Sequence, residues 1–207
     1  LDGDGDWVII IDENVNVLNG EEIIFIFAKY YLYEKKIKKG SVLVTNEVAN
    51  HGLDIALKKL GLKLKRVKVG DKNILKEILD NKHFFGGEPS GHFIFKDDIL
   101  IGDGMATAIR LLTLILKEKK MLSVLRNGIN LLEELNINQR IDREKFYLNQ
   151  ESIYKKLNNL LKNLEIYYNI RPSGTEPLLR VNLQYDKRNI KVTTLNKLKK
   201  QIIKVIS

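Results

Sequence analysis

The sequence predicts an α/β layer domain followed by a smaller α+β domain, and two observations carry this prediction. Between residues 20 and 120, short apolar runs of strand type alternate with segments of helical periodicity. After residue 120 the expected order changes to helix, strand, helix, two strands and a final helix. We therefore expect three parts: residues 1–19, an α/β domain over residues 20–119 and an α+β domain over residues 120–207.

Composition is that of a globular protein. The 207 residues are 44% hydrophobic and 29% charged, and no apolar run approaches the roughly 20 residues of a membrane span. Cysteine is absent, which excludes disulfides and thiolate metal sites and favours a cytoplasmic location. The net charge of +9 comes from dispersed lysines without interleaved aromatic residues. We therefore expect an anionic small-molecule substrate, and neither nucleic acid nor a membrane, as the partner.

The elements of the α/β part follow from apolar periodicity and cap residues. An apolar run over residues 8–11 indicates a strand, and Asn19-Gly20-Glu21-Glu22 begins a helix that extends to residue 34. The chain opens on an acidic loop with no element before it, so we expect it to be the later part of a longer protein. The other expected elements are strand 42–45, helix 52–60, strand 62–69, helix 73–79, strands 84–85 and 93–95, and helix 105–117.

The α+β part shows a different order. We expect a helix over residues 121–135 and a short strand over 137–141. An amphipathic helix follows, with Leu157 and Leu161 on its apolar stripe. A strand over 166–170 leads into a polar loop, a strand over 179–185 leads out of it, and an apolar stripe from Leu195 marks a last helix.

The first candidate site is the acidic loop Asp2-Gly3-Asp4-Gly5-Asp6. Aspartates at alternate positions, separated by glycines that permit a tight curl, can direct three carboxylates at one centre. Such hard oxygen ligands suit Mg²⁺ or Ca²⁺. An EF-hand would add Glu13 as a ligand, but Trp7 occupies the position that needs glycine, and this sequence offers no helix in front of the loop. Asx turns without a metal are the remaining alternative.

The second candidate site is the loop Gly86-Gly87-Glu88-Pro89-Ser90-Gly91-His92, between two apolar strands. Its glycines allow a ligand to approach the backbone closely. We expect Glu88, Ser90 and His92 to point outward, where they would suit the vicinal hydroxyls of a sugar. His92 is in addition a candidate for proton transfer. A glycine-rich hairpin with incidental polar side chains is the alternative.

The third candidate site is the loop Arg171-Pro172-Ser173-Gly174-Thr175-Glu176-Pro177. The Arg171 guanidinium, the hydroxyls of Ser173 and Thr175, and the backbone N–H groups around Gly174 suit a phosphate monoester. A nearby arginine at position 180 would strengthen the positive field. The alternative is a polar hairpin loop that binds nothing.

In this order and separation, the three loops resemble the metal-binding, sugar-binding and phosphate-binding loops of the α-D-phosphohexomutases. Residues 50–61, 69–71, 102–104 and 178–181 are similar to the bacterial phosphoglucosamine mutase branch of that family. The resemblance implies a four-domain enzyme, of which this chain would supply the end of the second domain, the third domain and the C-terminal domain. The N-terminal domains of the same enzyme would then be partners, and a homodimer is left open.

The resemblance also implies roles for the site residues. The reaction would interconvert glucosamine 6-phosphate and glucosamine 1-phosphate by phosphoryl transfer through a phosphoserine, with a hexosamine phosphate as substrate. By this resemblance Mg²⁺ would be held by Asp2, Asp4 and Asp6, sugar hydroxyls by Glu88 and Ser90, and the phosphate that does not react by Arg171, Ser173, Gly174 and Thr175; His92 would assist proton transfer.

The chain departs from the family pattern in three respects. Trp7 stands where the family usually has arginine, and Lys72 stands where the branch commonly has arginine, which loses the planar guanidinium. The phosphorylated serine belongs to the family's first domain, and no similar loop occurs in this sequence. We therefore expect this chain alone to be inactive. The alternatives are a phosphoglucomutase or phosphomannomutase fragment and a non-catalytic module that binds sugar phosphates.

Overall fold

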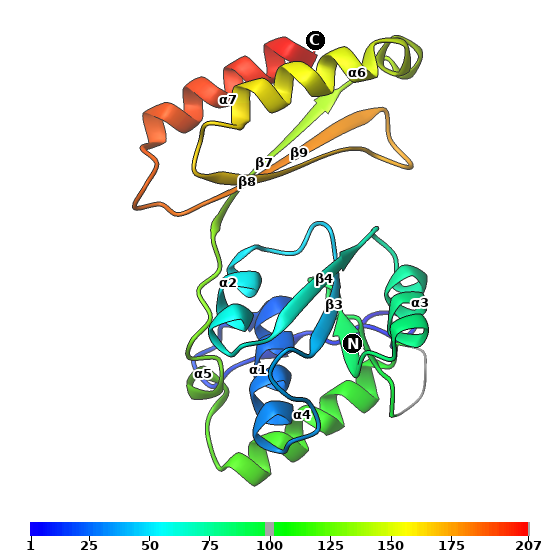
Figure 1. Cartoon of the computed structure of the whole chain (residues 1–207), viewed down its shortest axis with the longest axis vertical. Helices are drawn as coiled ribbons and strands as arrows, with labels where there is room; N and C mark the ends of the chain where they lie inside the picture. The colour runs from blue at the N-terminus through cyan, green and yellow to red at the C-terminus, as the bar shows by residue number, and fades with distance from the viewer. Residues whose placement is uncertain (98–101, 207) are drawn as a thin grey trace. The chain divides into compact units, whose positions relative to one another are not determined.

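The computed structural model describes residues 1–97 and 102–206. The chain divides into two compact units, Leu1–Leu131 and Leu132–Ser207, and each is described by itself (Figure 1). The division comes later than the domain boundary expected after residue 119, because Leu125 and Ile129 are buried in the core of the first unit. Among the described residues, no helix has both the length and the apolar character needed to cross a membrane.

The first unit contains a four-stranded sheet in the order β4-β3-β5-β6. Strand β3 (Val42–Asn46) pairs in parallel with β4 (Lys63–Val67) and β5 (Phe85–Gly87), and β6 (Phe93–Phe95) runs antiparallel to β5. A separate antiparallel pair, β1 (Ile10–Ile11) and β2 (Val17–Leu18), follows the acidic loop. The helices are α1 (Gly20–Tyr33), α2 (Gly52–Lys59), α3 (Asp71–Asn81), α4 (Gly104–Glu118) and α5 (Leu122–Leu125).

Helices cover both faces of this sheet. Successive side chains of a strand point to opposite faces. Leu43 therefore belongs to the core that contains α1, whereas the next residue, Val44, packs with Ile74 and Ile78 of α3. All four side chains are fully buried. The unit is thus an α/β layer structure, as the sequence predicts.

Helix α1 is the centre of the larger core. Its residues 23–28 are almost completely buried, as is typical of a helix that is apolar on all sides. The Phe27 ring lies 5.2 Å from the Phe95 ring and 5.8 Å from the Tyr31 ring, measured between centroids. At the start of the helix, the Asn19 N–H donates to Glu22 Oε2 at 2.9 Å. This packing fixes the beginning of α1, which contacts the glycine loop.

The second unit is an antiparallel sheet covered by two helices. Strands β7 (Glu133–Arg140), β9 (Leu178–Tyr185) and β8 (Ile166–Pro172) lie in the order β7-β9-β8. Helices α6 (Arg143–Leu161) and α7 (Val192–Ile206) pack on one face, as Figure 1 shows. The predicted fold class, α/β followed by α+β, is confirmed.

The helix predicted over residues 121–135 is wrong. Only the single turn α5 forms, and the chain then leaves the helical conformation at Gly128, whose φ is +112°. A Cβ at this position would lie 3.1 Å from the Phe25 ring, a close contact that also disfavours a larger residue. Strand β7 begins at Glu133 and absorbs both the end of the expected helix and most of the expected strand over 137–141.

Candidate functional site

The acidic loop brings its three aspartates together. One carboxylate oxygen from each of Asp2, Asp4 and Asp6 lies within 4.8 Å of the others. The Trp7 N–H donates to Asp2 Oδ1 at 3.1 Å, and the Gly104 N–H donates to the Gly5 carbonyl oxygen at 3.0 Å. The loop is therefore closed on itself and joined to the first turn of α4.

Electrostatics in the loop fit a bound cation. Desolvation, followed by repulsion from Asp4, raises the pKa of Asp6. For Asp2, desolvation is outweighed by hydrogen bonds, chiefly from the Trp7 N–H, and its pKa is lowered. Among the described residues, Asp6 Oδ1 is buried without a hydrogen-bond partner. Three converging carboxylates and one orphaned oxygen are the donor set that a hard divalent cation would satisfy.

The EF-hand alternative is not supported. Its twelfth ligand would be Glu13, but this carboxylate accepts a hydrogen bond from the Ser123 hydroxyl at the beginning of α5. The same contact lowers the pKa of Glu13, with the Ser123 hydroxyl as the largest cause. Glu13 is thus held by α5 and not by the acidic loop.

The glycine loop connects β5 to β6 and turns sharply. The Glu88 N–H donates to the His92 carbonyl oxygen at 2.8 Å, and the Gly91 N–H donates to the Glu88 carbonyl oxygen at 3.1 Å. Gly91 has a φ of +103°, and a Cβ there would lie 2.4 Å from the Val8 carbonyl oxygen. Glycine is therefore required at this position, both by conformation and by the close approach of the chain that follows the acidic loop.

Only one of the three polar side chains of this loop points outward. Ser90 is exposed, whereas Glu88 and His92 are buried, so the expectation that all three face solvent is wrong. Glu88 Oε1 accepts hydrogen bonds from Asn46 Nδ2 at 3.0 Å and from the Gly70 N–H at 3.2 Å. These two donors hold the Glu88 carboxylate at the ends of β3 and β4.

His92 joins the glycine loop to the acidic loop. Its Nδ1 lies 3.3 Å from Asp6 Oδ2, and the side chain is 5% exposed. A Cβ on Gly102 would lie 1.8 Å from His92 Nε2, so only glycine fits beside the ring. The structure thus places His92 with Asp6, whereas the other two histidines lie elsewhere: His83 pairs with Glu77 at 3.4 Å, and His51 precedes α2.

Sequence reasoning missed Asn46, Gly70 and Gly102 as supports of this site. Asn46 ends a buried parallel strand, and ligand sites commonly lie at the carboxyl ends of such strands. The position of Asn46 at the end of this strand is therefore the signal from which it could have been predicted as a site residue. Gly70 and Gly102 stand in segments that carry the family resemblance, but their contacts depend on long-range packing and could not be read from the local sequence.

The polar loop in the second unit joins β8 to β9. The Ser173 N–H donates to the Leu178 carbonyl oxygen at 2.8 Å, and Ser173 Oγ accepts from the Glu176 N–H at 3.3 Å. Gly174 and Thr175 are exposed. The loop is therefore a closed turn whose tip is open to solvent.

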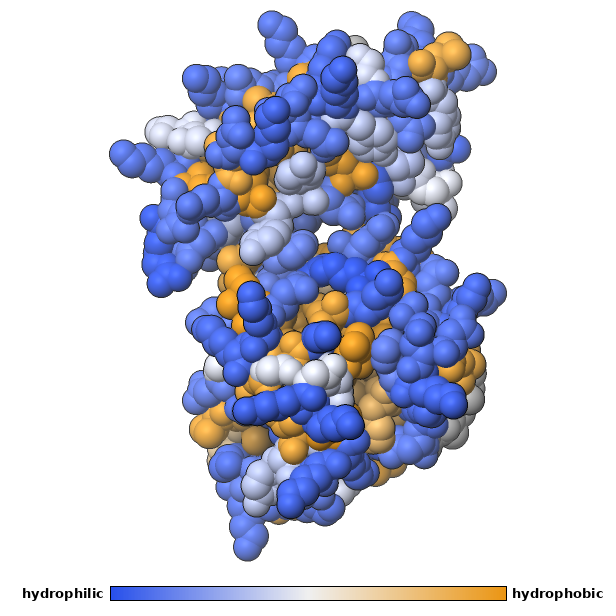
Figure 2. All heavy atoms as spheres, viewed as in Figure 1, coloured by the Kyte–Doolittle hydropathy of each residue, from blue (hydrophilic) through white to orange (hydrophobic). Residues whose placement is uncertain are grey.

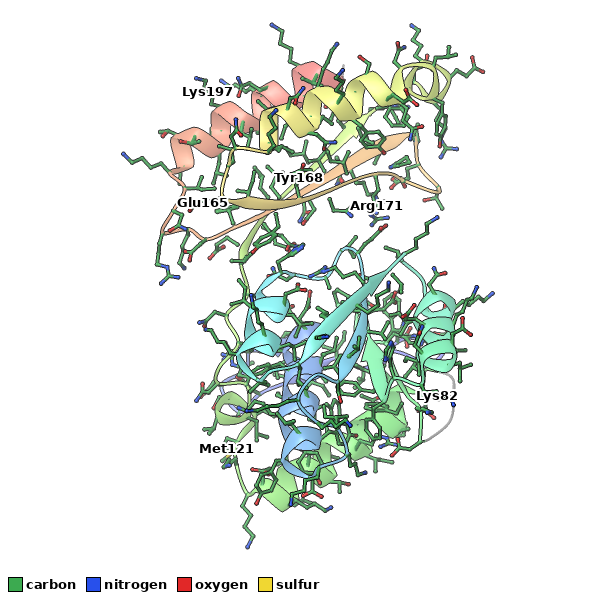
Figure 3. All side chains as sticks on the ribbon, in the orientation of Figure 1. Lys82, Met121, Glu165, Tyr168, Arg171 and Lys197 are labelled. Carbon is green, nitrogen blue, oxygen red and sulfur yellow. The ribbon has the colours of Figure 1, made fainter. Side chains whose placement is uncertain are left out.

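Two arginines lie side by side on the open face of this sheet. Arg171 of β8 is directly opposite Arg180 of β9, and both alternate with residues that face the helices. Figure 3 labels Arg171 on the side of the sheet away from α6 and α7. Like charges directly opposite each other destabilise a sheet, and an anion between them would remove that cost.

Two further contacts complete the surroundings of this loop, and sequence reasoning did not identify them. Arg180 Nη2 donates to Glu176 Oε2 at 2.8 Å. Arg143, at the beginning of α6, donates to the Glu176 carbonyl oxygen at 3.1 Å. Arg143 therefore ties the loop to the helix layer, and Glu176 balances part of the arginine charge.

Trp7 and Lys72 are the positions at which the sequence departs from the expected pattern. The Trp7 side chain is 42% exposed beside the acidic loop. Its carbonyl oxygen would lie 2.6 Å from a Cβ on Gly104, so the backbone of Trp7 packs tightly on α4 while the indole remains accessible. Lys72 lies in the first turn of α3 and is exposed.

Comparisons with known proteins agree with one another. A family model described as phosphoglucomutase/phosphomannomutase, alpha/beta/alpha domain III, matches residues 19–131. The chain is 38% identical over 214 aligned positions to a phosphoglucosamine mutase of Ruminiclostridium cellulolyticum, covering 100% of the chain and 46% of that relative. It is 39% identical over 188 positions to a phosphoglucosamine mutase of Clostridium botulinum, covering 89% of the chain and 42% of that relative. The chain thus spans somewhat less than half the length of these curated relatives.

A solved structure has the same fold. The N-acetylphosphoglucosamine mutase of Aspergillus fumigatus, in complex with GlcNAc-6P and magnesium, matches with a TM-score of 0.78 at 15% identity. The match covers 100% of the chain and 51% of that structure. At this identity the likeness establishes the fold alone.

Proposed function

The chain belongs to the phosphoglucomutase/phosphomannomutase family, and from this membership we propose that it is the C-terminal part of a phosphoglucosamine mutase. The complete enzyme would interconvert glucosamine 6-phosphate and glucosamine 1-phosphate through a phosphoserine supplied by the N-terminal domains. The names of the two bacterial relatives support this branch of the family.

The acidic loop is the proposed magnesium site. Asp2, Asp4 and Asp6 would hold the ion, and Asp6 Oδ1 offers an oxygen that no described residue satisfies. Bound there, Mg²⁺ would supply positive charge that stabilises a phosphoryl group in transfer. Magnesium in the complex of the fungal neighbour supports this choice of metal.

The glycine loop is the proposed sugar site. Ser90 is exposed and would donate to or accept from a sugar hydroxyl. Glu88 is held by Asn46 and the Gly70 N–H, so its carboxylate is already oriented before a sugar binds. His92 is the proposed proton-transfer residue, and its contact with Asp6 couples it to the metal loop.

The polar loop of the second unit is the proposed site for the phosphate that does not react. Arg171 and Arg180 would provide guanidinium donors, and the exposed turn at Gly174 would provide backbone N–H groups. The hydroxyls of Ser173 and Thr175 complete the donor set. This loop would thus anchor the phosphate that is not transferred.

The observation that carries this proposal is the convergence of three carboxylates with His92 in a chain of this family. Calorimetry of the full chain with glucosamine 6-phosphate and Mg²⁺ tests it. Arg171→Ala removes a charged donor and should weaken binding by about 1.5–3 kcal/mol. His51→Ala, outside all three loops, should change it little; equal losses would refute the phosphate-loop assignment. Tighter binding of glucose 6-phosphate or mannose 6-phosphate would indicate a different branch of the family.

The exposed Trp7 favours a second candidate, a module that binds sugar phosphates without catalysis. The indole carries no charge, whereas a guanidinium at this position would stabilise negative charge in the transition state. In comparable roles, losing such a group raises the activation free energy by about 3 kcal/mol. A coupled assay for glucosamine 1-phosphate separates the candidates, using the chain together with the N-terminal half of a bacterial relative. Product from the wild type supports the mutase, whereas product only from Trp7→Arg supports the non-catalytic module.

A further inference from the structure

A pocket in the first unit is lined by no residue of the acidic loop or the glycine loop. It has a volume of about 470 Å³ and is lined by residues from the C-terminal half of α1, the end of α4 and the turn α5. Helix α4 begins at the acidic loop and ends at this pocket. Because α4 has 15 residues and rises 1.5 Å per residue, it separates the acidic loop from the pocket by about 20 Å. The pocket is therefore independent of the proposed magnesium site.

The wall of the pocket is mostly apolar. Ile26, Leu114 and Leu125 contribute to it from the buried core. Two tyrosine rings, Tyr30 and Tyr33, stand beside them on successive turns of α1. Figure 2 shows apolar surface between hydrophilic side chains on this unit. A volume of this size, with a few polar groups around an apolar wall, is typical of sites for small ligands.

Two lysines give the pocket a positive charge. Lys29 Nζ donates to the carbonyl oxygens of Leu125 and Asn127, both at 2.9 Å, and these are neutral acceptors. Lys120 Nζ pairs with Glu118 at 2.8 Å. The pocket therefore contains two ammonium groups and one carboxylate, and the carboxylate is already engaged.

The ammonium group of Lys29 is in an unfavourable environment. Desolvation, followed by repulsion from Lys120, lowers the pKa of Lys29. An ammonium group has three donors, of which the two carbonyl contacts use two, and Lys29 Nζ also lies over the Phe25 ring, 5.3 Å from its centroid. An anion at the remaining donor would relieve the repulsion and form a charge-assisted hydrogen bond.

We propose that this pocket, which we call the Lys29 pocket, binds a small amphiphilic anion, an aromatic or acyl group that carries one carboxylate or sulfonate. The apolar part packs on the rings of Tyr30 and Tyr33 and on Val124, with Ile26 and Leu114 buried behind them. The anionic group receives the third donor of Lys29 in place of the weaker contact with the Phe25 ring. The net charge of the pocket matches an anion of single charge, which distinguishes it from the phosphate loop with its paired arginines.

The probe for the test is 8-anilinonaphthalene-1-sulfonate, an aromatic sulfonate whose fluorescence rises in apolar surroundings. Titration of the full chain should give one saturable site, and decanoate should compete for it. Lys29→Gln removes the charge and keeps a donor, and it should weaken binding about tenfold, which corresponds to about 1.4 kcal/mol. Lys58→Gln, an exposed lysine of α2, makes the same charge change outside the pocket and should have no effect.

A second variant does not depend on the carbonyl contacts of Lys29. Val124 lines the pocket and is 47% exposed, so Val124→Glu places a repelling carboxylate at the wall without disturbing the core. It should weaken probe binding as much as Lys29→Gln does. The proposal is overturned if the wild type has no saturable site, or if Val124→Glu binds the probe like the wild type. Cooperative unfolding of each variant, followed by Trp7 fluorescence, establishes that the unit remains folded.

Discussion

Replacing Gly20 by alanine should displace the glycine loop from the start of α1. A Cβ at this position would lie 2.0 Å from the Glu88 carbonyl oxygen and 2.9 Å from two backbone atoms of Pro89. Ordinary contact begins at 3.4 Å, so the carbonyl oxygen must retreat by about 1.4 Å. This oxygen also accepts the Gly91 N–H, and the Gly20 N–H donates to Pro89 at 3.1 Å. The retreat therefore strains the turn that positions Glu88.

The expected cost is about 1–3 kcal/mol, the usual range for overpacking a rigid contact. Helix propensity acts in the opposite direction, since alanine in a helix is favoured over glycine by about 1 kcal/mol. Urea unfolding followed by Trp7 fluorescence reports on the first unit, because Trp7 is the only tryptophan. The net loss is then about 1 kcal/mol, and with a urea dependence of about 2 kcal/mol per molar the midpoint should fall by about 0.5 M.

Gly3→Ala is the matched control for this measurement. A Cβ on Gly3 would have no atom within 4 Å, so its midpoint should equal that of the wild type. An unchanged midpoint in Gly20→Ala as well would refute the reasoning, because it would mean that the loop moves without cost. A large loss in both variants would show that glycine flexibility, and not the contact with Glu88, is what matters.

Three further predictions concern the second unit and the metal. Leu157→Ala removes a fully buried side chain of the α6 core and should lower the free energy of unfolding of the second unit by about 2–5 kcal/mol. Far-UV circular dichroism follows this unfolding, while the transition monitored by Trp7 fluorescence in the first unit should not change. The Asp186 carboxyl should titrate at about 2 by NMR, mainly because the Arg188 side chain donates to it, and Arg188→Gln should return the midpoint toward 3.8. Because the pKa of Asp186 is lower in the folded state, the Asp186–Arg188 pair stabilises the fold above about pH 3.8. This stabilisation is lost as the pH falls through about 2. Mg²⁺ should bind weakly, because three carboxylates supply only part of its preferred octahedral coordination and water must supply the rest. A dissociation constant in the micromolar range or below, measured by calorimetry, would contradict this.

The fold was predictable wherever local signals agreed with packing. The acidic first turn of α1 and the apolar run that follows identify a buried helix, and the alternation of strands and helices identifies the α/β layers. The exception is the segment from 121 to 135, where leucines at helical spacing favour a helix. Gly128, packed under the Phe25 ring at a positive φ, overrides that propensity. Nothing in the local pattern reveals the ring above this glycine.

The site was predictable in its residues but not in their orientation. Alternating Asp and Gly in residues 2–6 was enough to predict that three carboxylates converge. Outward-facing Glu88 and His92 were a reasonable expectation for a glycine-rich loop, because such loops usually lie on the surface. The prediction fails because Asn46 and Asp6, distant in sequence, draw these two side chains inward.

The metal loop and the phosphate loop differ in what holds them. The phosphate loop is a turn between neighbouring strands, closed by its own hydrogen bonds at Ser173 and tied by Arg143. The acidic loop depends on contacts from separate segments, the Gly104 N–H of α4 and His92 of the glycine loop. Loosening the core of the first unit should therefore weaken metal binding before the unit unfolds. The second unit should keep its affinity for phosphate under the same conditions, because the hydrogen bonds that close its loop, at Ser173 and from Arg143, lie within that unit.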